Sequence, residues 1–552
     1  MSIEKKYILH EKRKLTIYLM LISLSYIALT FINVFTNYEL REFMGVDENS
    51  IIGSIHALFE SPIYDMNGAY HSRVYGWTYF ALNFLAIAPL KIMGLDSEVA
   101  VNLTVKFAHF LIGYALVLSF FKLARKIVSL TPALFSTLFL IATPVTHYYI
   151  LVIHPESLGS LLFIWGILFL NKIGGSEYKF RYYLMALVFF TLSSLCKQVF
   201  FLISFPCLAY FWWMQINQKS KSKWSDYIVL KKGSVRYFLI LTLLIPILVL
   251  FMIHPHFILD FQQSIEYQLR PLSHSKGDLS ASSLLWLEQF ALHPLFYVHS
   301  ILLISIPFKL KGKFNQEFKY SIITVTALTL LFCFMQKIMP KAIYLFPLYP
   351  IYILNIAYFM FGVAWSKRIV IINYIIASVF FIPQLAVAFS ESYYSVFSKF
   401  YYSKNDTSYL AYQSISKIPN DMSILYMPTV PMPSTHRDSA CHIWRNCNTT
   451  KHLKKISPEL LYINWEYEYF DKEKYEEFVK SEGYILDDEI NPTDRNNIKV
   501  EFNCQATRLS TIISPLSVPR RIEYCLELLY YSVDVYKNDL FVGSPISIYR
   551  KN

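Results

Sequence analysis

The chain has 552 residues, of which 55% are hydrophobic and 16% are charged, and its mean hydropathy is +0.36. A water-soluble fold could not cover so much apolar surface, so this composition excludes an ordinary soluble enzyme and predicts a chain that lies in a membrane. The formal net charge of +12 does not indicate nucleic-acid binding, because the basic residues gather in short connections between apolar runs.

The N-terminal segment predicts a first membrane span. A cluster of Lys and Arg residues between positions 5 and 14 precedes an apolar run from Leu15 to about Thr36. The run is about 20 residues long, which is longer than the core of a signal peptide, and no small-residue cleavage site follows it. We therefore expect an uncleaved span with a cytoplasmic N-terminus.

The following apolar runs predict an α-helical multi-pass membrane protein with about eleven spans. Lys and Arg resist translocation, so each inward connection should collect them. This rule orients the whole chain in the cell inner (plasma) membrane. The predicted spans are 15–36, 100–121, 127–150, 157–170, 182–196, 199–214, 236–253, 294–308, 319–336, 342–362 and 369–390.

An additional apolar segment, from Val74 to Gly94, is a candidate for a twelfth span. Counting it as a span would move Lys122, Arg125 and Lys126 to the outside and invert every later loop. We therefore expect an amphipathic element along the outer interface, within a first outer loop at about 37–99. A true span is the alternative.

The composition changes at residue 391. Apolar runs shorten, charges of both signs return, and turn-forming pairs appear. We expect a transmembrane domain over 1–390 and an extracytoplasmic (periplasmic) mixed α/β domain over 391–552. Within the latter, the runs 423–427 and 546–549 predict strands, and 472–481 predicts a helix.

Four of the seven cysteines lie in this C-terminal part: Cys441, Cys447, Cys504 and Cys525. An oxidising compartment favours two disulfides among them, and four cysteines permit three connectivities. A metal site with the nearby histidines is a weaker interpretation, because the CxxC spacing is missing.

Ionisable residues recur in the predicted outer connections, where small polar residues would have sufficed. Asp47 and Glu48 follow the first span, Glu156 follows the third, and Lys197 follows the fifth. Lys337 and Lys341 follow the ninth span and precede Tyr344. Charged groups near a bilayer are costly, so their grouping at one face predicts an outer site with acids and bases.

These stretches resemble the GT-C superfamily of membrane glycosyltransferases, and within it the protein O-mannosyltransferase and aminoarabinose transferase group. The family has an Asp-Glu pair at the start of a long first outer loop, interfacial helices in that loop, an acid in the next outer loop, and a late Lys-x-x-Tyr segment opening a span. The matching stretches here are Asp47-Glu48, Arg73-Val74-Tyr75-Gly76-Trp77, His154-Pro155-Glu156 and Lys341-Ala342-Ile343-Tyr344-Leu345-Phe346-Pro347.

The resemblance implies a GT-C-type transferase that moves a sugar from a polyprenyl-phosphate donor in the bilayer to a hydroxyl of a glycan, lipid or protein acceptor. Asp47 would be the base, with Glu48 beside it, and one displacement would invert the anomeric centre. Glu156 would orient the acceptor or Asp47, or help hold a divalent cation; no other cofactor and no dedicated metal site are expected. The candidates for binding the donor phosphate are Arg73, Lys197, Arg270, Lys337, Lys341 and Tyr344.

Other interpretations remain open. The loop from His254 to His293 is rich in histidine, but its irregular spacing favours solvated or interfacial side chains over a metal site. A flippase or transporter of lipid-linked sugars would normally show repeated halves, and no internal duplication is visible. An O-antigen polymerase or ligase is a further alternative, although the acids come early in this chain and the late loops are short.

Overall fold

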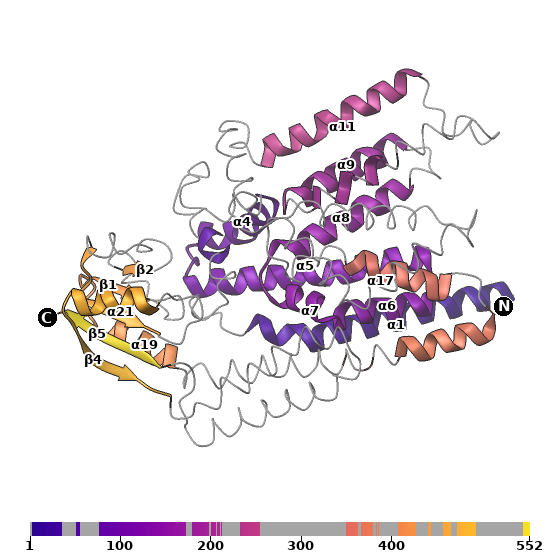
Figure 1. Cartoon of the computed structure of the whole chain (residues 1–552). Coiled ribbons are helices and arrows are strands. Elements are labelled where there is room, and N and C mark those ends of the chain that lie inside the picture. Colours follow the sequence, from indigo (N-terminus) through magenta and orange to yellow (C-terminus); the bar gives the residue numbers. More distant parts are fainter. Residues whose placement is uncertain are drawn as a thin grey trace. The chain divides into compact units, whose positions relative to one another are not determined.

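The computed structural model describes residues 3–35, 51–55, 77–172, 179–197, most of 200–211, 232–253, 349–362, 366–378, 382, 385, 407–426, 440–442, 456–464, 472–492 and 545–551. Its contacts divide the chain into two compact units (Figure 1). The first comprises Met1–Phe35, Ser50–Ala388 and Ile512–Pro515, and the second comprises Thr36–Asn49, Phe389–Thr511 and Leu516–Asn552.

The described part of the first unit is helical. Helices cover most of the predicted spans that fall within the described residues, because long apolar runs satisfy their backbone hydrogen bonds internally as helices. The helices are α1 (Ile3–Val34), α4 (Trp77–Ile92), α5 (Glu98–Ile127), α6 (Leu130–Ala142), α7 (Pro144–Leu151), α8 (Pro155–Lys172), α9 (Lys179–Ser194), α11 (Lys232–Ile253) and α17 (Tyr349–Ala357), which continues as the π-helical η6 (Tyr358–Gly362). A further helical stretch covers 367–378.

The predicted span over 127–150 contains two helices, and the span itself stays a prediction. The chain forms α6, interrupts the helix at Thr143, and restarts as α7 at Pro144. Proline lacks the N–H that a continuing helix needs but suits a first helical position, which explains the break. The Thr143 hydroxyl donates to the Phe139 carbonyl at 2.7 Å and so satisfies the end of α6.

α5 is central to the described helices of the first unit, since it packs against α1, α4, α6 and α8. α8 also packs against α9. Side-chain hydroxyls link these apolar surfaces: the Tyr26 hydroxyl donates to the Phe110 carbonyl at 2.8 Å, and Ser23 and Tyr114 share a hydrogen bond of 2.6 Å. The helices are therefore held by polar contacts as well as by apolar packing.

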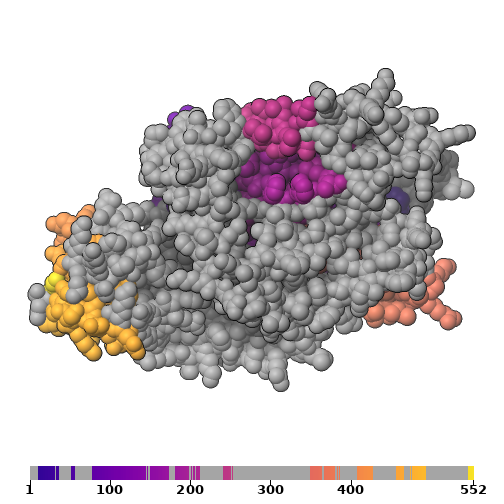
Figure 2. Space-filling view, turned by 45° about the horizontal axis from the view of Figure 1, so that its top comes forward, coloured from indigo at the N-terminus to yellow at the C-terminus, as the bar shows by residue number. Residues whose placement is uncertain are grey.

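Several helices expose large apolar side chains. Leu24 on α1 and Leu243 on α11 are 64% and 71% exposed, and a row of isoleucines is exposed on the stretch 367–378. Figure 2 shows α11, in pink, at the surface beside the purple helices, and α11 packs against α9. Such faces suit contact with lipid rather than water.

Two helical segments in the described part of the chain, His10–Phe31 and Glu98–Ile127, are long and apolar enough to cross a bilayer. The number of spans, about eleven, and the orientation of the termini stay predictions. α4 lies within the predicted interfacial segment Val74–Gly94. Its first turn, from Trp77 to Phe80, is buried together with Asn83, whereas Leu82 is 38% exposed and the far end exposes Ile92.

The described part of the second unit is a five-stranded mixed sheet with helices α19 (Thr407–Ser416) and α21 (Lys472–Ser481). The strands are β1 (Ile424–Tyr426), β2 (Ala440–His442), β3 (Leu460–Ile463), β4 (Tyr484–Ile490) and β5 (Ile546–Lys551), in the order β2-β1-β3-β5-β4. β1 is parallel to β2 and β3, whereas β5 is antiparallel to β3 and β4.

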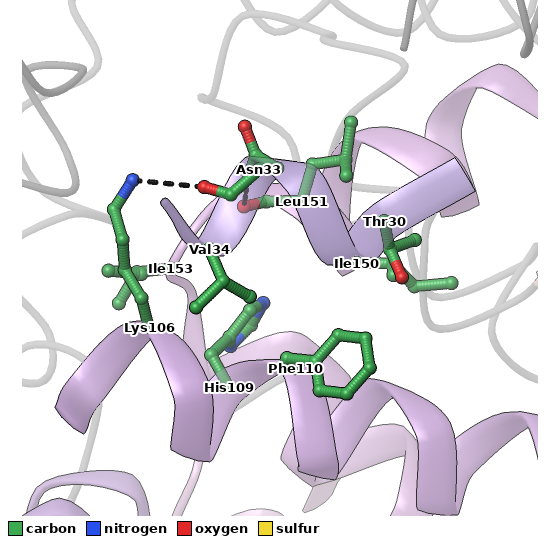
Figure 3. A pocket seen from close by; sticks show the side chains of 9 residues that line it. All are labelled: Thr30, Asn33, Val34, Lys106, His109, Phe110, Ile150, Leu151 and Ile153. Atoms are coloured by element: carbon green, nitrogen blue, oxygen red, sulfur yellow. Dashed lines mark hydrogen bonds between the residues drawn. The ribbon is translucent and has the colours of Figure 1, made fainter. Parts of the chain in front are cut away.

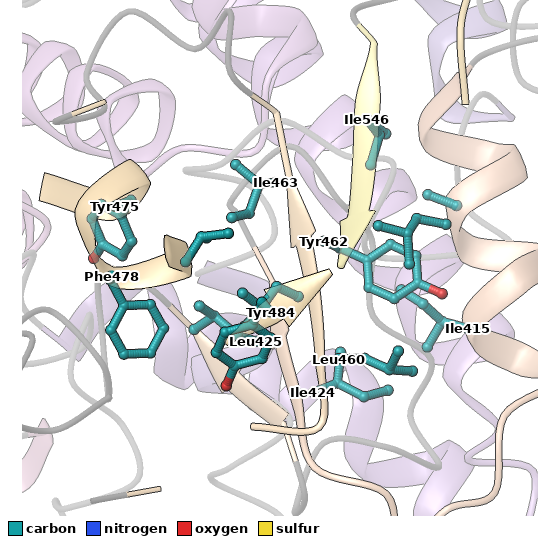
Figure 4. Close-up of a cluster of buried hydrophobic side chains, with 14 residues drawn as sticks. Ile415, Ile424, Leu425, Leu460, Tyr462, Ile463, Tyr475, Phe478, Tyr484 and Ile546 are labelled. Atoms are coloured by element: carbon teal, nitrogen blue, oxygen red, sulfur yellow. The ribbon is translucent and has the colours of Figure 1, made fainter. Parts of the chain in front are cut away.

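The core of this unit contains Ile424, Leu461 and Ile548 from the sheet and Tyr475 and Phe478 from α21 (Figure 4). The predicted helix at 472–481 and the predicted strands at 423–427 and 546–549 are confirmed. Cys441 lies on β2, whereas Cys447, Cys504 and Cys525 lie outside the described residues, so the disulfides stay a prediction.

Candidate active site

Glu156 opens α8 and is buried. Its predecessor Pro155 is the first residue of the helix, where a missing N–H costs nothing, and the carboxylate lies in the first turn, where the helix dipole favours negative charge. The Glu156 side chain is 1% exposed. A carboxylate removed from water to this extent requires charged or hydrogen-bonding partners.

Two cationic or potentially cationic side chains supply them. The Lys197 ammonium donates to Glu156 Oε1, and His154 Nδ1 is hydrogen-bonded to Oε2. The His154 and Lys197 side chains are 6% and 19% exposed. Both carboxylate oxygens are therefore engaged, and Lys197 is the member of the group that retains some access to the surface.

Close packing of α8 and α9 brings Lys197 to Glu156. Gly159 lies one turn after Glu156, and a Cβ at this position would overlap the ring of Phe200. The Ser193 hydroxyl donates to the Gly159 carbonyl at 2.7 Å, which joins the end of α9 to the start of α8. A small residue at 159 thus lets the segment after α9 approach the buried acid.

The start of α4 is held at the same end of α9. The Thr78 hydroxyl donates to the Leu192 carbonyl at 2.9 Å, and the Thr78 N–H donates to the Leu195 carbonyl at 3.3 Å. A helix from the predicted first outer loop therefore lies next to the chain segment that carries Lys197.

A second polar group lies on α4, α5 and α7. His109 Nε2 is 3.0 Å from the Tyr149 carbonyl, and Nδ1 is 3.2 Å from the Tyr79 hydroxyl. A carbonyl can only accept, so Nε2 carries the hydrogen, and in the neutral ring Nδ1 accepts from Tyr79. The Ser157 hydroxyl also donates to the Tyr149 carbonyl, at 2.7 Å, which connects this group to the residue that follows Glu156.

The sequence interpretation did not identify Tyr79, Lys106 or His109 as site residues. Lys106 and His109 are 5% and 2% exposed and lie inside the predicted span 100–121. An ionisable side chain within a span is by itself a reason to suspect function, and that signal was available in the sequence.

Of the predicted site residues, the structure places Glu156 and Lys197 and brings them together. The other candidates, Asp47, Glu48, Arg73, Arg270, Lys337, Lys341 and Tyr344, lie outside the described residues, as does the loop from His254 to His293. Within the described ranges, no group of three or more His, Cys, Asp or Glu side chains could hold a metal ion.

Both Glu156 oxygens are engaged, Oε1 by the Lys197 ammonium and Oε2 by His154 Nδ1. The carboxylate can therefore hold the Lys197 ammonium in place through a charge-assisted hydrogen bond. An ammonium held in this way can contact an anion in an environment where water screens it poorly.

No protein-family model matches the chain, and no curated protein matches it in sequence. Solved structures match over most of its length. ArnT from Cupriavidus metallidurans in the apo state has 12% identity and a TM-score of 0.54, covering 86% of this chain and 96% of that one. The same protein bound to undecaprenyl phosphate has 11% identity and a TM-score of 0.51, with 86% and 95% covered.

The third match is the archaeal oligosaccharyltransferase AglB from Archaeoglobus fulgidus, in complex with an inhibitory peptide and a dolichol-phosphate. It has 11% identity and a TM-score of 0.52, and the alignment covers 100% of this chain and 89% of that one. ArnT is an aminoarabinose transferase, and both proteins are GT-C glycosyltransferases. The chain therefore has the fold of the GT-C membrane glycosyltransferases.

Proposed function

We propose that this protein is a membrane glycosyltransferase that moves a sugar from a polyprenyl-phosphate donor to an acceptor hydroxyl at the outer face of the membrane. The observation that carries the proposal is the buried Glu156–Lys197 ion pair, present in a chain with the GT-C fold. A polar centre of this kind has a cost in an apolar bundle, and binding of a charged substrate is a reason to keep it.

The fold neighbours support a lipid-linked donor. ArnT has been solved with undecaprenyl phosphate and AglB with a dolichol-phosphate. Both ligands combine an isoprenoid chain with an anionic phosphate. A donor anchored in the bilayer in this way needs no soluble-nucleotide site, and the sequence has no Walker motif.

In the proposed mechanism Asp47 removes the proton from the acceptor hydroxyl as its oxygen attacks the anomeric carbon. The bond from that carbon to the phosphate oxygen breaks, and the electron pair leaves with the lipid phosphate. Lys197 offsets the charge of the departing phosphate together with Arg73 and Lys341. A single displacement inverts the anomeric configuration.

Glu156 and His154 act on this step through Lys197. The Glu156 carboxylate fixes the position of the Lys197 ammonium through Oε1, and the hydrogen bond from His154 to Oε2 fixes the orientation of the carboxylate. Both are positioning residues, so their loss should alter use of the donor more than the attack by the acceptor.

The test is transfer of labelled sugar from a polyprenyl-phosphate donor by the full-length chain in liposomes, with glycan, lipid and peptide acceptors supplied in parallel. Asp47→Asn keeps the shape of the side chain but removes the proton acceptor, so transfer should fall by about two to four orders of magnitude. Asp96→Asn is the matched control, because Asp96 is exposed and lies outside the proposed machinery.

Two results would contradict the proposal. Undiminished transfer by a well-folded Asp47→Asn protein would remove the assigned base. A wild-type protein that moves intact lipid-linked sugar across the bilayer without cleaving it would identify a flippase instead.

A further inference from the structure

The two ends of α5 carry positive charge in different surroundings. Near its start, Lys106 is buried, and its ammonium donates to the Asn33 carbonyl at 3.4 Å (Figure 3). At its end, Lys122, Arg125 and Lys126 are exposed. The predicted topology places this second end in an inner connection, on the opposite side of the membrane from the proposed active site. The end of α5 is therefore a surface that the proposed transfer reaction does not use.

The neighbouring helices bring further cations to the same end of the bundle. Lys172 is the last residue of α8, Arg181 lies in the first turn of α9, and both are exposed. α8 packs against both α5 and α9 (Figure 1). Lys122 lies within electrostatic range of Lys126 and Lys172, so the positive charges of α5 and α8 repel each other. We call Lys122, Arg125, Lys172 and Arg181 the inner cation cluster.

Aromatic rings hold the two lysines of this cluster in place. The Lys122 ammonium lies 4.3 Å from the centroid of the Trp165 ring, and the Lys172 ammonium lies 5.1 Å from that of the Tyr182 ring. The Trp165 indole N–H donates to the Ser119 hydroxyl at 3.0 Å, which fixes the ring against α5. A cation–π contact orients an ammonium but does not neutralise its charge. Both lysines can therefore still bind an anion.

No carboxylate offsets these charges within the described ranges, where no Asp or Glu side chain forms an ion pair with the inner cation cluster. The positive-inside rule explains why basic residues stay on this side of the membrane, but it does not require them to gather over one group of rings. Because like charges that gather in this way repel each other, an anion bound between them would stabilise the arrangement.

The rings continue along the helices, away from the cations. Phe169 lies 5.7 Å from Trp165 and 5.4 Å from Phe189, measured between ring centroids, and Trp165 lies 6.2 Å from Phe189. All three side chains are half-buried, so part of each ring faces outward. Trp165 precedes the end of α8 by about two turns, which is toward the membrane interior in the predicted topology. Cations followed by rings fit an anionic headgroup with hydrocarbon chains better than a soluble anion.

We propose that this end of α5, α8 and α9 binds an anionic phospholipid of the inner leaflet whose headgroup carries two phosphates. One phosphate contacts Lys122 on α5 and the other contacts Lys172 on α8, because the two lysines lie over different rings. The acyl chains lie on Phe169 and Phe189. Basic pockets between helices on the cytoplasmic side suit headgroups of this kind. The site does not depend on the proposed transfer reaction, since lipid binding is measured without a sugar donor or acceptor.

The experiment adds cardiolipin, which has two phosphates, to the delipidated full-length chain and measures binding by native mass spectrometry. Replacing Lys122 and Lys172 together with Gln should weaken binding about 10- to 30-fold, because each cation near an anionic headgroup contributes about fivefold in affinity. Replacing both with Arg should retain binding. The matched control is Lys367→Gln with Arg368→Gln, since these cations are exposed and lie on the same predicted side, and it should bind like the wild type.

Other lipids test which headgroup is bound. Phosphatidylglycerol has one phosphate and should bind at least about fivefold more weakly than cardiolipin, and zwitterionic phosphatidylcholine should bind more weakly still. Farnesyl phosphate, a short analogue of the proposed donor, should displace cardiolipin poorly. A photoreactive cardiolipin should label the α8 peptide that contains Trp165 and Phe169 in the wild-type protein, and this result does not depend on how well the variants fold.

Several results would overturn the proposal. They are equal cardiolipin binding by a folded protein with both Lys122→Gln and Lys172→Gln, an equal loss in the Lys367→Gln, Arg368→Gln control, equal affinity for phosphatidylglycerol, efficient displacement by farnesyl phosphate, and labelling that avoids α8. Failure of the proposed function is distinguishable, because an Asp47→Asn protein with full sugar transfer would leave cardiolipin binding unchanged.

Discussion

The Glu156–Lys197 pair can be tested by neutralising each partner alone and both together. Glu156→Gln retains the shape of the side chain, and Lys197→Met retains most of its length. Each single variant removes one of the two charges that form this ion pair, and Glu156 keeps only its hydrogen bond with His154 when Lys197 is replaced. The double variant removes both charges, so its cost in free energy of unfolding should be smaller than the sum of the two single costs.

The magnitudes follow from the burial of the two groups. Glu156 is 1% exposed and accepts on both oxygens, whereas glutamine has one accepting oxygen and would direct its NH₂ group at a donor. We expect Glu156→Gln to cost about 2–4 kcal/mol. Breaking a buried pair costs about 3–5 kcal/mol, and Lys197 is 19% exposed, so Lys197→Met should lie near the lower end. The coupling energy between the two changes should be about 2 kcal/mol.

The assay is reversible unfolding in mixed micelles by titration with SDS, followed by circular dichroism. The exposed pair of Arg550 and Asp487, with N and O atoms 3.0 Å apart, gives a matched cycle whose coupling should stay below about 1 kcal/mol. Additive effects of Glu156→Gln and Lys197→Met, within about 0.5 kcal/mol, would refute the ion pair and with it the positioning role of Glu156.

Three further predictions follow from particular contacts. Gly159→Ala should destabilise the protein by about 1–3 kcal/mol, because the added methyl overlaps the Phe200 ring. Phe200→Leu, introduced into the Gly159→Ala protein, should restore the melting temperature. An unchanged melting temperature in Gly159→Ala would contradict this packing. Burial, with the nearby Glu482 carboxylate, raises the pKa of Tyr484 to about 12, and its neutral hydroxyl donates to the Pro458 carbonyl at 2.5 Å. The contribution of Tyr484 to the free energy of unfolding should therefore be complete below about pH 10, the pKa in the unfolded chain, and should be lost between about pH 10 and 12. Tyr484→Phe should reduce that decline in alkaline unfolding curves, and identical curves would argue against it. Cysteines introduced after residues 50 and 403 should react with an impermeant reagent in intact cells, and those after 223 and 311 should not; labelling of 223 together with 403 would exclude the proposed topology.

The sequence alone determined where helices form in the described part of the first unit and which short connections carry charged side chains. Long apolar runs must be helical in a bilayer, so most of the predicted spans over the described residues match helices, and the amphipathic stretch 472–481 matches α21. The acid at Glu156 was identifiable as well, because a carboxylate in a short, apolar-flanked connection is costly. These features depend on residues close together along the chain.

The pairing of side chains was decided only by the tertiary structure. Lys197 was predicted as a phosphate contact and Glu156 as a separate acid, yet the approach of α8 and α9 at Gly159 joins them. Lys106 and His109 are recognisable in the sequence as ionisable residues inside an apolar run, but the groups that their side chains contact are decided only when the neighbouring helices are placed. The contact of Lys106 with Asn33, and that of His109 with Tyr149, each join helices that are far apart in the chain, and local sequence patterns carry no information about such distances.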